Sequence, residues 1–298
     1  MPSLVSKIAL RVSGPLVGSK RLYAQTPLPI AKQRKTDVKR PRGWMTPGCR
    51  LDAGHLGTMP SHSIVPKRTR SSDRIVLYLH GGAYVFGPLF WHWNGCAKLA
   101  RKSGIRFELP DYPLAPESTF EVTIEAVVSG YRQLLETYDP SNITVMGDSA
   151  GGGLSAALMV ALIEAGLPLP RRCVLISPWV DLQTSVAELA KLDERDVLLH
   201  SSGVRACALL YAGGEEQLSN PLVSPINGNL ARFPELLVFN ASEDILSPRS
   251  EDFAAQAKAG GVPVQSALWQ GQMHAWVLSP AVPEAIQARR QIVAAITS

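Results

Sequence analysis

Short apolar runs alternate with longer amphipathic stretches along most of the chain after residue 75. The runs are rich in β-branched and other apolar residues, and they predict strands at Ile75–Leu79, Arg106–Leu109, Ile143–Met146, Cys173–Ile176, Leu236–Phe239 and Val264–Leu268. The intervening stretches predict helices at Trp91–Lys102, Phe120–Tyr138, Gly152–Ala165, Ser250–Ala259 and Pro283–Ile296. Regular alternation of strand and helix predicts an α/β fold with a mainly parallel sheet and helices on both of its faces.

Two regions, residues 1–48 and 181–229, interrupt this alternation. Insertions of this size in an α/β fold often cover the active site. We therefore predict that residues 1–48 form the N-terminal part of a helical cap over a catalytic domain of residues 49–298, and that residues 181–229 contribute a second part of the cap. In such a cap, apolar residues near the start of the chain would cover the substrate, namely Leu4, Val5, Ile8, Leu10 and Val12.

Composition narrows the class of protein. The 298 residues are 46% hydrophobic and 18% charged, which excludes a disordered chain. No apolar run approaches the roughly 18 residues of a membrane-spanning helix, and Ile8–Leu10 is too short for a secretory signal. The four cysteines lie far apart, which predicts free thiols in a reducing compartment rather than a disulfide frame or a zinc site. We expect a cytoplasmic protein with no stable membrane anchoring.

The net charge of +5 is unevenly distributed. Residues 1–50 hold eleven Lys and Arg against Asp37 alone, whereas the remaining residues hold 19 bases and 24 acids. Clustered bases can attract nucleic acid or an anionic membrane, but no aromatic residues alternate with them as a base-stacking platform requires. We interpret the segment as a solvated extension partly paired with an acidic body, and we expect no nucleic-acid partner. A homodimer is compatible with the sequence.

The pentapeptide Gly147-Asp148-Ser149-Ala150-Gly151 has the pattern G-x-S-x-G. It lies between a predicted strand and a predicted helix, which is the setting of a nucleophile elbow. The glycines are needed because side chains in so tight a turn would crowd the neighbouring backbone. The helix N-terminus behind Ser149 favours developing negative charge. Ser149 is therefore the predicted nucleophile.

A pair of glycines in His80-Gly81-Gly82-Ala83 directly follows the predicted strand Ile75–Leu79. Glycines at this place let backbone N–H groups face a cavity without obstruction by side chains. In an acyl-transfer enzyme, the N–H groups of Gly81 and Gly82 would hold the oxyanion together with that of Ala150. His80 precedes Ser149 in the chain, so we expect it to orient this loop rather than to act as the base.

Four motifs together resemble the hormone-sensitive-lipase group of α/β-hydrolases, the bacterial family IV esterases: HGGAYVFG at 80–87, DYPLAPE at 111–117, GDSAGG at 147–152 and SPWVDL at 177–182. The resemblance covers about residues 45–298. It implies an eight-stranded sheet, a helical cap, no cofactor or metal, and hydrolysis of carboxylic esters with short acyl chains. Ala83 and Pro113 depart from the usual Gly and Arg, and we expect them to affect the shape of the substrate site rather than the reaction type.

The triad partners should follow the nucleophile in the order acid and then histidine. Of the six histidines, only His200 and His274 follow Ser149, and His200 lies inside the second insertion. His274 comes just after the last predicted strand and matches the family's histidine, so it is the predicted base. For the acid, the resemblance implies Asp244, which opens a D-x-L sequence 30 residues before His274, with Glu243 as the alternative.

These parts predict a carboxylesterase that acts on small-molecule esters of short- to medium-chain acids through an acyl-enzyme intermediate. An amidase or peptidase, or a dehydratase, on the same fold is the alternative. Asp148, Asp111 and Glu117 are expected to be structural carboxylates that accept loop backbone N–H groups. Several apolar residues near the motifs line either the substrate pocket or the core, namely Tyr84, Phe86, Trp91, Trp93, Trp179 and Val180.

Overall fold

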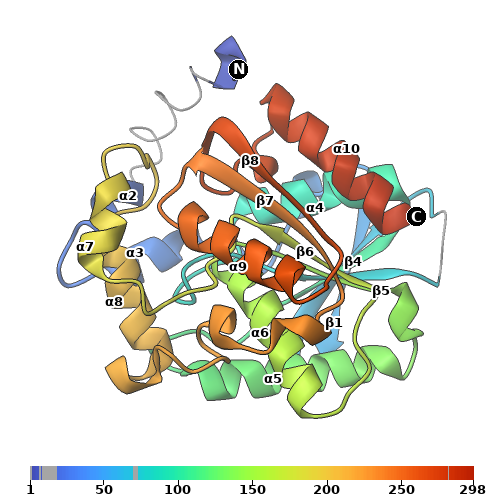
Figure 1. Cartoon of the computed structure of the whole chain (residues 1–298). Coiled ribbons are helices and arrows are strands. Elements are labelled where there is room, and N and C mark those ends of the chain that lie inside the picture. Colours follow the sequence, from blue (N-terminus) through green and yellow to red (C-terminus); the bar gives the residue numbers. More distant parts are fainter. Residues whose placement is uncertain (1, 7, 9–18, 70–72, 281) are drawn as a thin grey trace.

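The structure is a computed structural model that describes residues 2–6, 8, 19–69, 73–280 and 282–298 (Figure 1). In this described part, eight strands form one sheet in the order β1-β2-β4-β3-β5-β6-β7-β8. The strands are β1 (Cys49–Leu56), β2 (Met59–Pro66), β3 (Ile75–Leu79), β4 (Arg106–Pro110), β5 (Ile143–Asp148), β6 (Arg172–Ile176), β7 (Glu235–Glu243) and β8 (Val264–Met273). The predicted α/β-hydrolase fold with an eight-stranded sheet is confirmed.

The strands from β3 to β8 pair in parallel, whereas β1 and β2 form an antiparallel hairpin at one edge, where β2 pairs with β4. The alternation pattern did not predict this hairpin. Four of the eight residues of β1, Asp52 among them, are polar or glycine, and the strand is mostly exposed or half-buried. An edge strand with one solvated face does not need the continuous apolar run that marks a central parallel strand.

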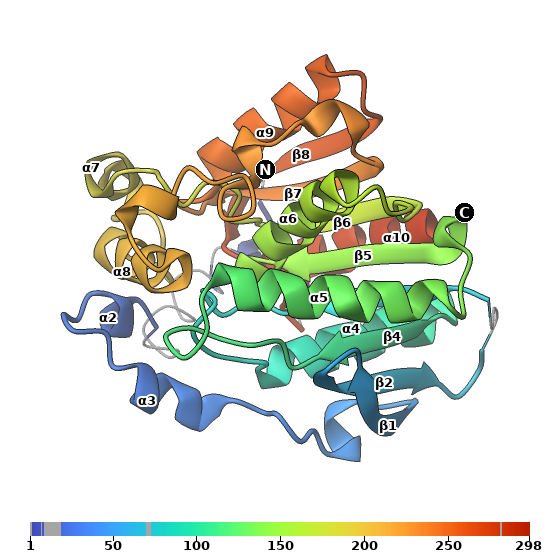
Figure 2. The ribbon, with the colours of Figure 1, turned by 90° about the horizontal axis from the view of Figure 1, so that it is seen from below.

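Helices cover both faces of the sheet (Figures 1 and 2). The strand β3 shows how the two layers are divided, because Leu77 and Leu79 pack into one core and Val76 and Tyr78 into the other. The first core contains α5 (Phe120–Leu135), α6 (Ala150–Glu164) and α9 (Ser247–Ala259), and the second contains α4 (Phe90–Ser103) and α10 (Pro283–Thr297). Period-two alternation along a strand that is buried on both sides is what a three-layer α/β arrangement requires.

The insertion between β6 and β7 contains α7 (Val186–Leu189) and α8 (Ser201–Ala212), and the N-terminal segment contains α2 (Ser19–Tyr23) and α3 (Ile30–Gln33). Helices α2 and α8 contact each other, and these helices gather at one end of the sheet (Figure 2). Gly203 of α8 allows the contact, since a Cβ atom there would lie 2.3 Å from the carbonyl oxygen of Tyr23. The two regions that interrupt the strand–helix alternation are therefore neighbours in space.

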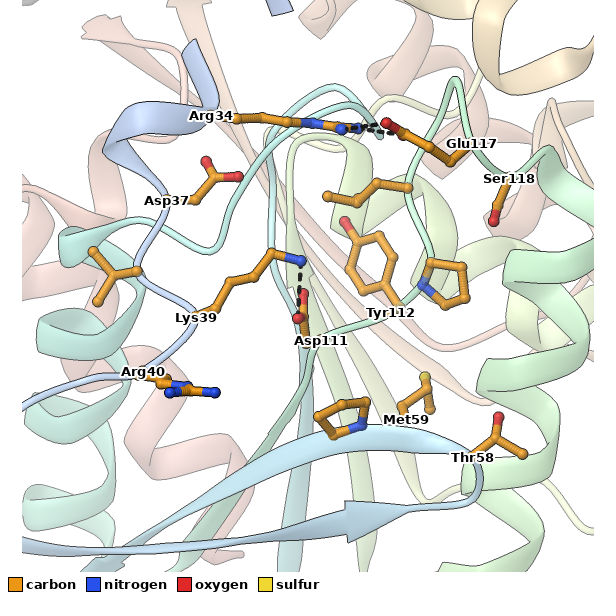
Figure 3. Close-up of a pocket in the computed structure, with 14 residues that line it drawn as sticks. Arg34, Asp37, Lys39, Arg40, Thr58, Met59, Asp111, Tyr112, Glu117 and Ser118 are labelled. Atoms are coloured by element: carbon orange, nitrogen blue, oxygen red, sulfur yellow. Dashed lines mark hydrogen bonds and ion pairs between the residues drawn. The ribbon is translucent and has the colours of Figure 1, made fainter. Parts of the chain in front are cut away.

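The chain between α3 and β1 is fastened to the loop that follows β4 (Figure 3). Arg34 donates to both carboxylate oxygens of Glu117, at 2.7 and 2.8 Å, and Lys39 lies 3.0 Å from Asp111. The hydrogen bond with Arg34 lowers the pKa of Glu117 to about 2. From the sequence we expected Asp111 and Glu117 to accept loop backbone N–H groups, and the structure shows that both also pair with basic side chains. Two cations of the basic segment therefore do pair with the acidic body, as expected.

The start of the chain differs from the predicted cap. Leu4, Val5 and Ile8 are exposed, at 73%, 46% and 53% of their surface, while Leu10 and Val12 lie outside the described residues. The polar residues of this segment contact the body of the protein instead, since the hydroxyl groups of Ser3 and Ser6 donate to Glu284 in the first turn of α10. The apolar residues of this turn therefore face away from the body of the protein.

The structure also bears on the state of the cysteines and on the presence of a membrane-spanning helix. All four cysteines are free and buried, as expected from their spacing. Among the described residues, no helix is long and apolar enough to cross a membrane.

Candidate active site

Ser149 occupies a sharp turn between β5 and α6. Its backbone angles are φ 55° and ψ −125°, a region that residues with a side chain rarely adopt. The flanking glycines make this turn possible, since a Cβ atom on Gly147 would lie 2.2 Å from the carbonyl oxygen of Gly151, and one on Gly151 would lie 2.0 Å from that of Leu79. Strain of this kind is held by surrounding structure and is frequent at functional sites.

Asp244 and His274 are brought together by the ends of β7 and β8. Asp244 Oδ2 lies 2.9 Å from Nδ1 of His274, and Asp244 Oδ1 accepts the N–H of Leu246 at 2.9 Å. Both side chains are buried, with 1% and 6% of the residue exposed. Burial lowers the pKa of His274, but the charge of Asp244, its hydrogen bond and the charges of two further carboxylates together raise it by more, so the net shift is upward. The carboxylate thus stabilises the imidazolium form and fixes the ring orientation.

Glu243, the alternative acid, points elsewhere. Its two carboxylate oxygens accept hydrogen bonds from Arg195 at 3.0 and 3.1 Å. This pairing lowers the pKa of Glu243. The geometry therefore places Asp244, and not Glu243, against the histidine.

Ser149 and His274 line the same cavity, which has a volume of about 310 Å³. Most of its other lining residues are apolar, and they come from four separate parts of the chain. Tyr23 comes from α2, and Leu198 and Leu199 come from the insertion. The loop before α4 and its first turn supply Phe86, Leu89 and Trp91, and the end of β8 with the residues after it supplies Met273 and Leu278. A concave, mainly apolar site with a few convergent polar groups is typical of small-molecule binding.

The loop after β3 supplies backbone N–H groups beside Ser149, although not all those expected. The N–H of Gly81 donates to Asp148 Oδ1 at 3.1 Å. The prediction that this N–H faces the oxyanion is therefore wrong, because the group is already hydrogen-bonded. The N–H groups of Gly82, Ala83 and Ala150 donate to no acceptor within the described parts of the chain. Ala83 was not predicted from the sequence; its φ of 51° continues the unusual backbone path of Gly82.

Asp148 fixes this loop through hydrogen bonds. Its carboxylate accepts the Tyr78 hydroxyl at 2.7 Å as well as the N–H of Gly81, and it lies 3.4 Å from Nε2 of His92. Burial raises the pKa of Asp148, but His92, Tyr78 and Gly81 lower it by more, so the carboxylate stays ionised. The predicted structural role of Asp148 agrees with these contacts, whereas sequence reasoning missed His92.

His80 lies behind the same loop. Its ring stacks on Tyr112 with 4.4 Å between ring centroids, and its Nδ1 lies 2.8 Å from the carbonyl oxygen of Gly81. Burial lowers the pKa of His80 to about 3, so the imidazole is neutral. These contacts fit a residue that orients the loop and not a general base.

Comparison with known proteins decides the family. Residues 76–278 match a protein-family model whose members have the α/β hydrolase fold. The chain belongs to this family. An acetyl-hydrolase of Streptomyces hygroscopicus is 34% identical to the hydrolase over 245 residues, which cover 79% of this chain and 82% of that protein. An esterase of Acinetobacter venetianus is 31% identical over 234 residues, which cover 78% of this chain and 77% of that protein.

Solved structures agree with this assignment. The crystal structure of an esterase from the bacterial hormone-sensitive lipase family superimposes with a TM-score of 0.86 and 31% identity, covering 100% of this chain and 99% of that one. The predicted family, the hormone-sensitive-lipase esterases, and the predicted enzyme class, a carboxylesterase of the serine-hydrolase type, are therefore confirmed.

The predicted pocket residues of the hydrolase divide into two groups. Phe86 and Trp91 line the cavity that contains Ser149. Tyr84, Trp179 and Val180 are buried in the core instead, where Tyr84 stacks on Tyr211 with 3.7 Å between ring centroids. Apolar residues of core and pocket look alike in a sequence, so only the fold separates them. Trp93 is also buried in the core.

The hydrolase has a second, larger cavity of about 810 Å³ (Figure 3). It lies between residues 34–40 and the loop after β4, and its lining includes none of Ser149, Asp244 and His274. Its charged side chains largely satisfy one another through the Arg34–Glu117 and Lys39–Asp111 pairs. We therefore place the chemistry in the smaller cavity. Across the described residues, no group of three or more His, Cys, Asp or Glu side chains is arranged to hold a metal ion.

Proposed function

We propose that the hydrolase cleaves esters of short- to medium-chain carboxylic acids through a Ser149–His274–Asp244 triad and an acyl-enzyme intermediate. The observation that carries the proposal is the buried 2.9 Å contact between Asp244 and His274 beside a cavity that also contains the strained Ser149. Since Nδ1 of His274 faces Asp244, Nε2 is the nitrogen that remains to take the proton of Ser149.

The reaction then takes two steps. Ser149 Oγ attacks the ester carbonyl carbon while His274 takes its proton, and the N–H groups of Gly82, Ala83 and Ala150 hold the resulting oxyanion. The carbon–oxygen bond to the alcohol breaks, and the alcohol leaves with the proton from His274. A water molecule, deprotonated by the same histidine, attacks the acyl-enzyme, and Ser149 regains its proton as the acid leaves.

Two parts of the chain form the cap in this proposal, α2 and the insertion that contains α7 and α8. Ser19 and Tyr23 of α2, and Leu198 and Leu199 of the insertion, all line the catalytic cavity. A cavity of about 310 Å³ is at the small end of ligand pockets, which supports substrates with short acyl chains.

The test is a Ser149→Ala variant assayed with p-nitrophenyl esters from C2 to C16 and with p-nitroanilides. We expect ester turnover to fall to the residual rate, about 10³–10⁴ over water, that binding and oxyanion contacts alone provide. Covalent labelling by an organophosphonate should disappear with it. A folded Ser149→Ala protein with esterase rates near wild type would exclude the triad, and faster cleavage of anilides than of esters by the wild type would indicate an amidase.

A further inference from the structure

Asp196 is a buried carboxylate in the insertion, and no motif singled it out. Its residue is 0% exposed. Oδ1 accepts the N–H groups of Leu198 and Leu199 at 2.8 and 2.9 Å, and Oδ2 accepts the N–H of Ile245 at 3.0 Å. A buried carboxylate that accepts three backbone N–H groups is well satisfied and firmly held.

Each of these N–H groups belongs to a part of the candidate active site. Leu198 and Leu199 line the catalytic cavity, and Ile245 directly follows Asp244, the acid of the proposed triad. One side chain of the insertion is therefore hydrogen-bonded both to the cavity wall and to the loop that carries the acid. No other side chain in the described part of the chain donates to or accepts from the backbone of both.

The N-terminal segment joins at the same place. Lys20 Nζ donates to the carbonyl oxygen of Asp196 at 2.7 Å and also to that of Asp193, and Ser19 Oγ donates to the carbonyl oxygen of Leu198 at 2.9 Å. Ser19 itself lines the cavity. Segments that are far apart in the sequence thus meet around Asp196.

We propose that Asp196 is a positioning residue for ester hydrolysis, which holds the cavity wall at Leu198 and Leu199 in register with Asp244 through the backbone of Ile245. This inference rests on the proposed triad. The carboxylate of Asp196 does not line the cavity and does not contact the reacting atoms. It therefore acts through Asp244 and through the two leucines. Displacement of a catalytic group by about 1 Å can lower the rate about 100-fold.

The charge of Asp196 gives its role a second, measurable effect. Burial and the neighbouring charge of Asp244 raise the pKa of Asp196 to about 6, and His274 opposes this rise. In return, Asp196 is one of the carboxylates that raise the pKa of His274, after Asp244 and ahead of Asp148. From α2, Tyr23 also faces this carboxylate, and burial, Cys207 and Asp196 raise its own pKa, so it remains neutral.

The sign of the effect on catalysis follows. His274 must be neutral to accept the proton of Ser149, so kcat/KM falls on the acid side as the imidazole becomes protonated. Removal of the negative charge of Asp196 destabilises the imidazolium and lowers the pKa of His274. The acid limb of the kcat/KM profile should therefore move to lower pH.

The experiment uses the full chain with Asp196→Asn, which keeps the shape of the side chain but removes its charge and one acceptor oxygen. We expect kcat/KM for p-nitrophenyl butyrate to fall between about 10- and 100-fold. The acid limb should move to lower pH, and KM should rise more for the octanoate than for the acetate ester because the wall at Leu198 and Leu199 loosens. An unmoved acid limb would overturn the inference.

Asp193→Asn is the matched control. Asp193 lies three residues earlier and accepts the N–H and hydroxyl of Ser201 at 2.8 and 2.6 Å, so it caps α8 without contacting the loop of Asp244. It should lower stability while leaving the acid limb in place. The same kinetic and pH changes in both variants would show a general effect of cap destabilisation and would refute a specific role for Asp196.

A second variant, Asp196→Glu, separates charge from position. The acid limb should stay at its wild-type pH, whereas kcat/KM should fall and the chain-length preference should change, because a longer side chain cannot make all three contacts. If Asp196→Glu showed wild-type kinetics at every chain length, the positioning role would be refuted. This result counts even if Asp196→Asn does not fold. Organophosphonate labelling of Ser149 in each variant tells the two proposals apart, since absence of labelling in the wild type contradicts the triad itself.

Discussion

Asp244 and Glu243 are adjacent carboxylates whose environments are opposite. Asp244 is buried against His274, while Glu243 is held by Arg195, whose side chain is 52% exposed. Successive residues at the end of a strand point to opposite sides. One of the two adjacent side chains therefore points into the interior and the other toward the surface. This alternation is the physical reason why only one of the pair can serve as the triad acid.

The two carboxylates give a direct test. We expect Asp244→Asn to lower kcat by about 10⁴, because an amide favours the wrong tautomer of the histidine. Glu243→Gln should change kcat less than about threefold, since it weakens a partly exposed ion pair with Arg195 outside the catalytic cavity. The measurement is steady-state kinetics with p-nitrophenyl butyrate, with thermal unfolding as a check of folding. If the Glu243 variant were the severely impaired one, the proposed triad would be wrong by one residue.

Single residues also show how far the sequence alone can reach. Ser149 and His274 were predicted because the order of triad residues and the strand ends leave little choice. Gly81 was assigned as an oxyanion donor because the sequence cannot show that Asp148 occupies its N–H. Asp196 could not be linked to the site from the sequence, since its bonds to Leu198 and Leu199 are those of an ordinary local turn and only its bond to Ile245, 49 residues away, reaches the loop of Asp244. Long-range hydrogen bonds leave no local pattern.

At the scale of elements, the contact between β5, α6 and β3 is what holds the nucleophile in place. Helix α6 is buried along its length from Ala150 to Leu162, and its first turn packs against the end of β3 with no room for side chains. The missing Cβ of Gly151 lets the backbone of α6 approach Leu79 closely. Close packing of this kind cannot relax around an added methyl group without a shift of backbone.

Gly151→Ala should therefore destabilise the hydrolase and displace Ser149. An added Cβ would lie 2.0 Å from the carbonyl oxygen of Leu79, and we expect a loss of about 1–3 kcal/mol of unfolding free energy, the usual range for overpacking. Gly54→Ala is the control, because nothing lies within 4 Å of a Cβ atom at this exposed position of β1. It should change the unfolding free energy by less than about 0.5 kcal/mol. Urea denaturation measures both, and equal stability of the two variants would contradict the packing argument.

Elements were predicted unevenly, for a physical reason. The central strands and the helices beside them are buried on both faces or amphipathic, and their patterns are strong. The hairpin of β1 and β2 escaped the pattern, since its burial is partial and its residues are mixed. The short helices of the insertion, such as α7, also lack a full amphipathic repeat, and tertiary contacts rather than propensity stabilise helices of this length.

Over the whole molecule, the basic N-terminal segment combines two kinds of contact. Arg34 and Lys39 pair with acidic residues of the body, which agrees with a solvated extension and leaves fewer free cations for an anionic partner. Further towards the start of the chain, Tyr23 is only 4% exposed and lines the catalytic cavity. The segment is therefore joined to the substrate site by α2, whereas the exposed Leu4, Val5 and Ile8 contribute nothing to its lining.

This arrangement predicts that α2 shapes the substrate site. Deletion of residues 2–28 keeps Arg34 and Lys39 but removes Tyr23, and we expect KM for C4 and C8 esters to rise and the chain-length preference to change while Ser149 still reacts with an organophosphonate. The point variant Tyr23→Ala should act in the same direction, and Arg21→Ala, on the exposed side of α2, should leave the kinetics unchanged. DNA binding by the full chain is measured at two salt concentrations. Unchanged ester kinetics after the deletion, together with salt-sensitive DNA binding, would show a nucleic-acid arm instead, because phosphate contacts weaken steeply with salt.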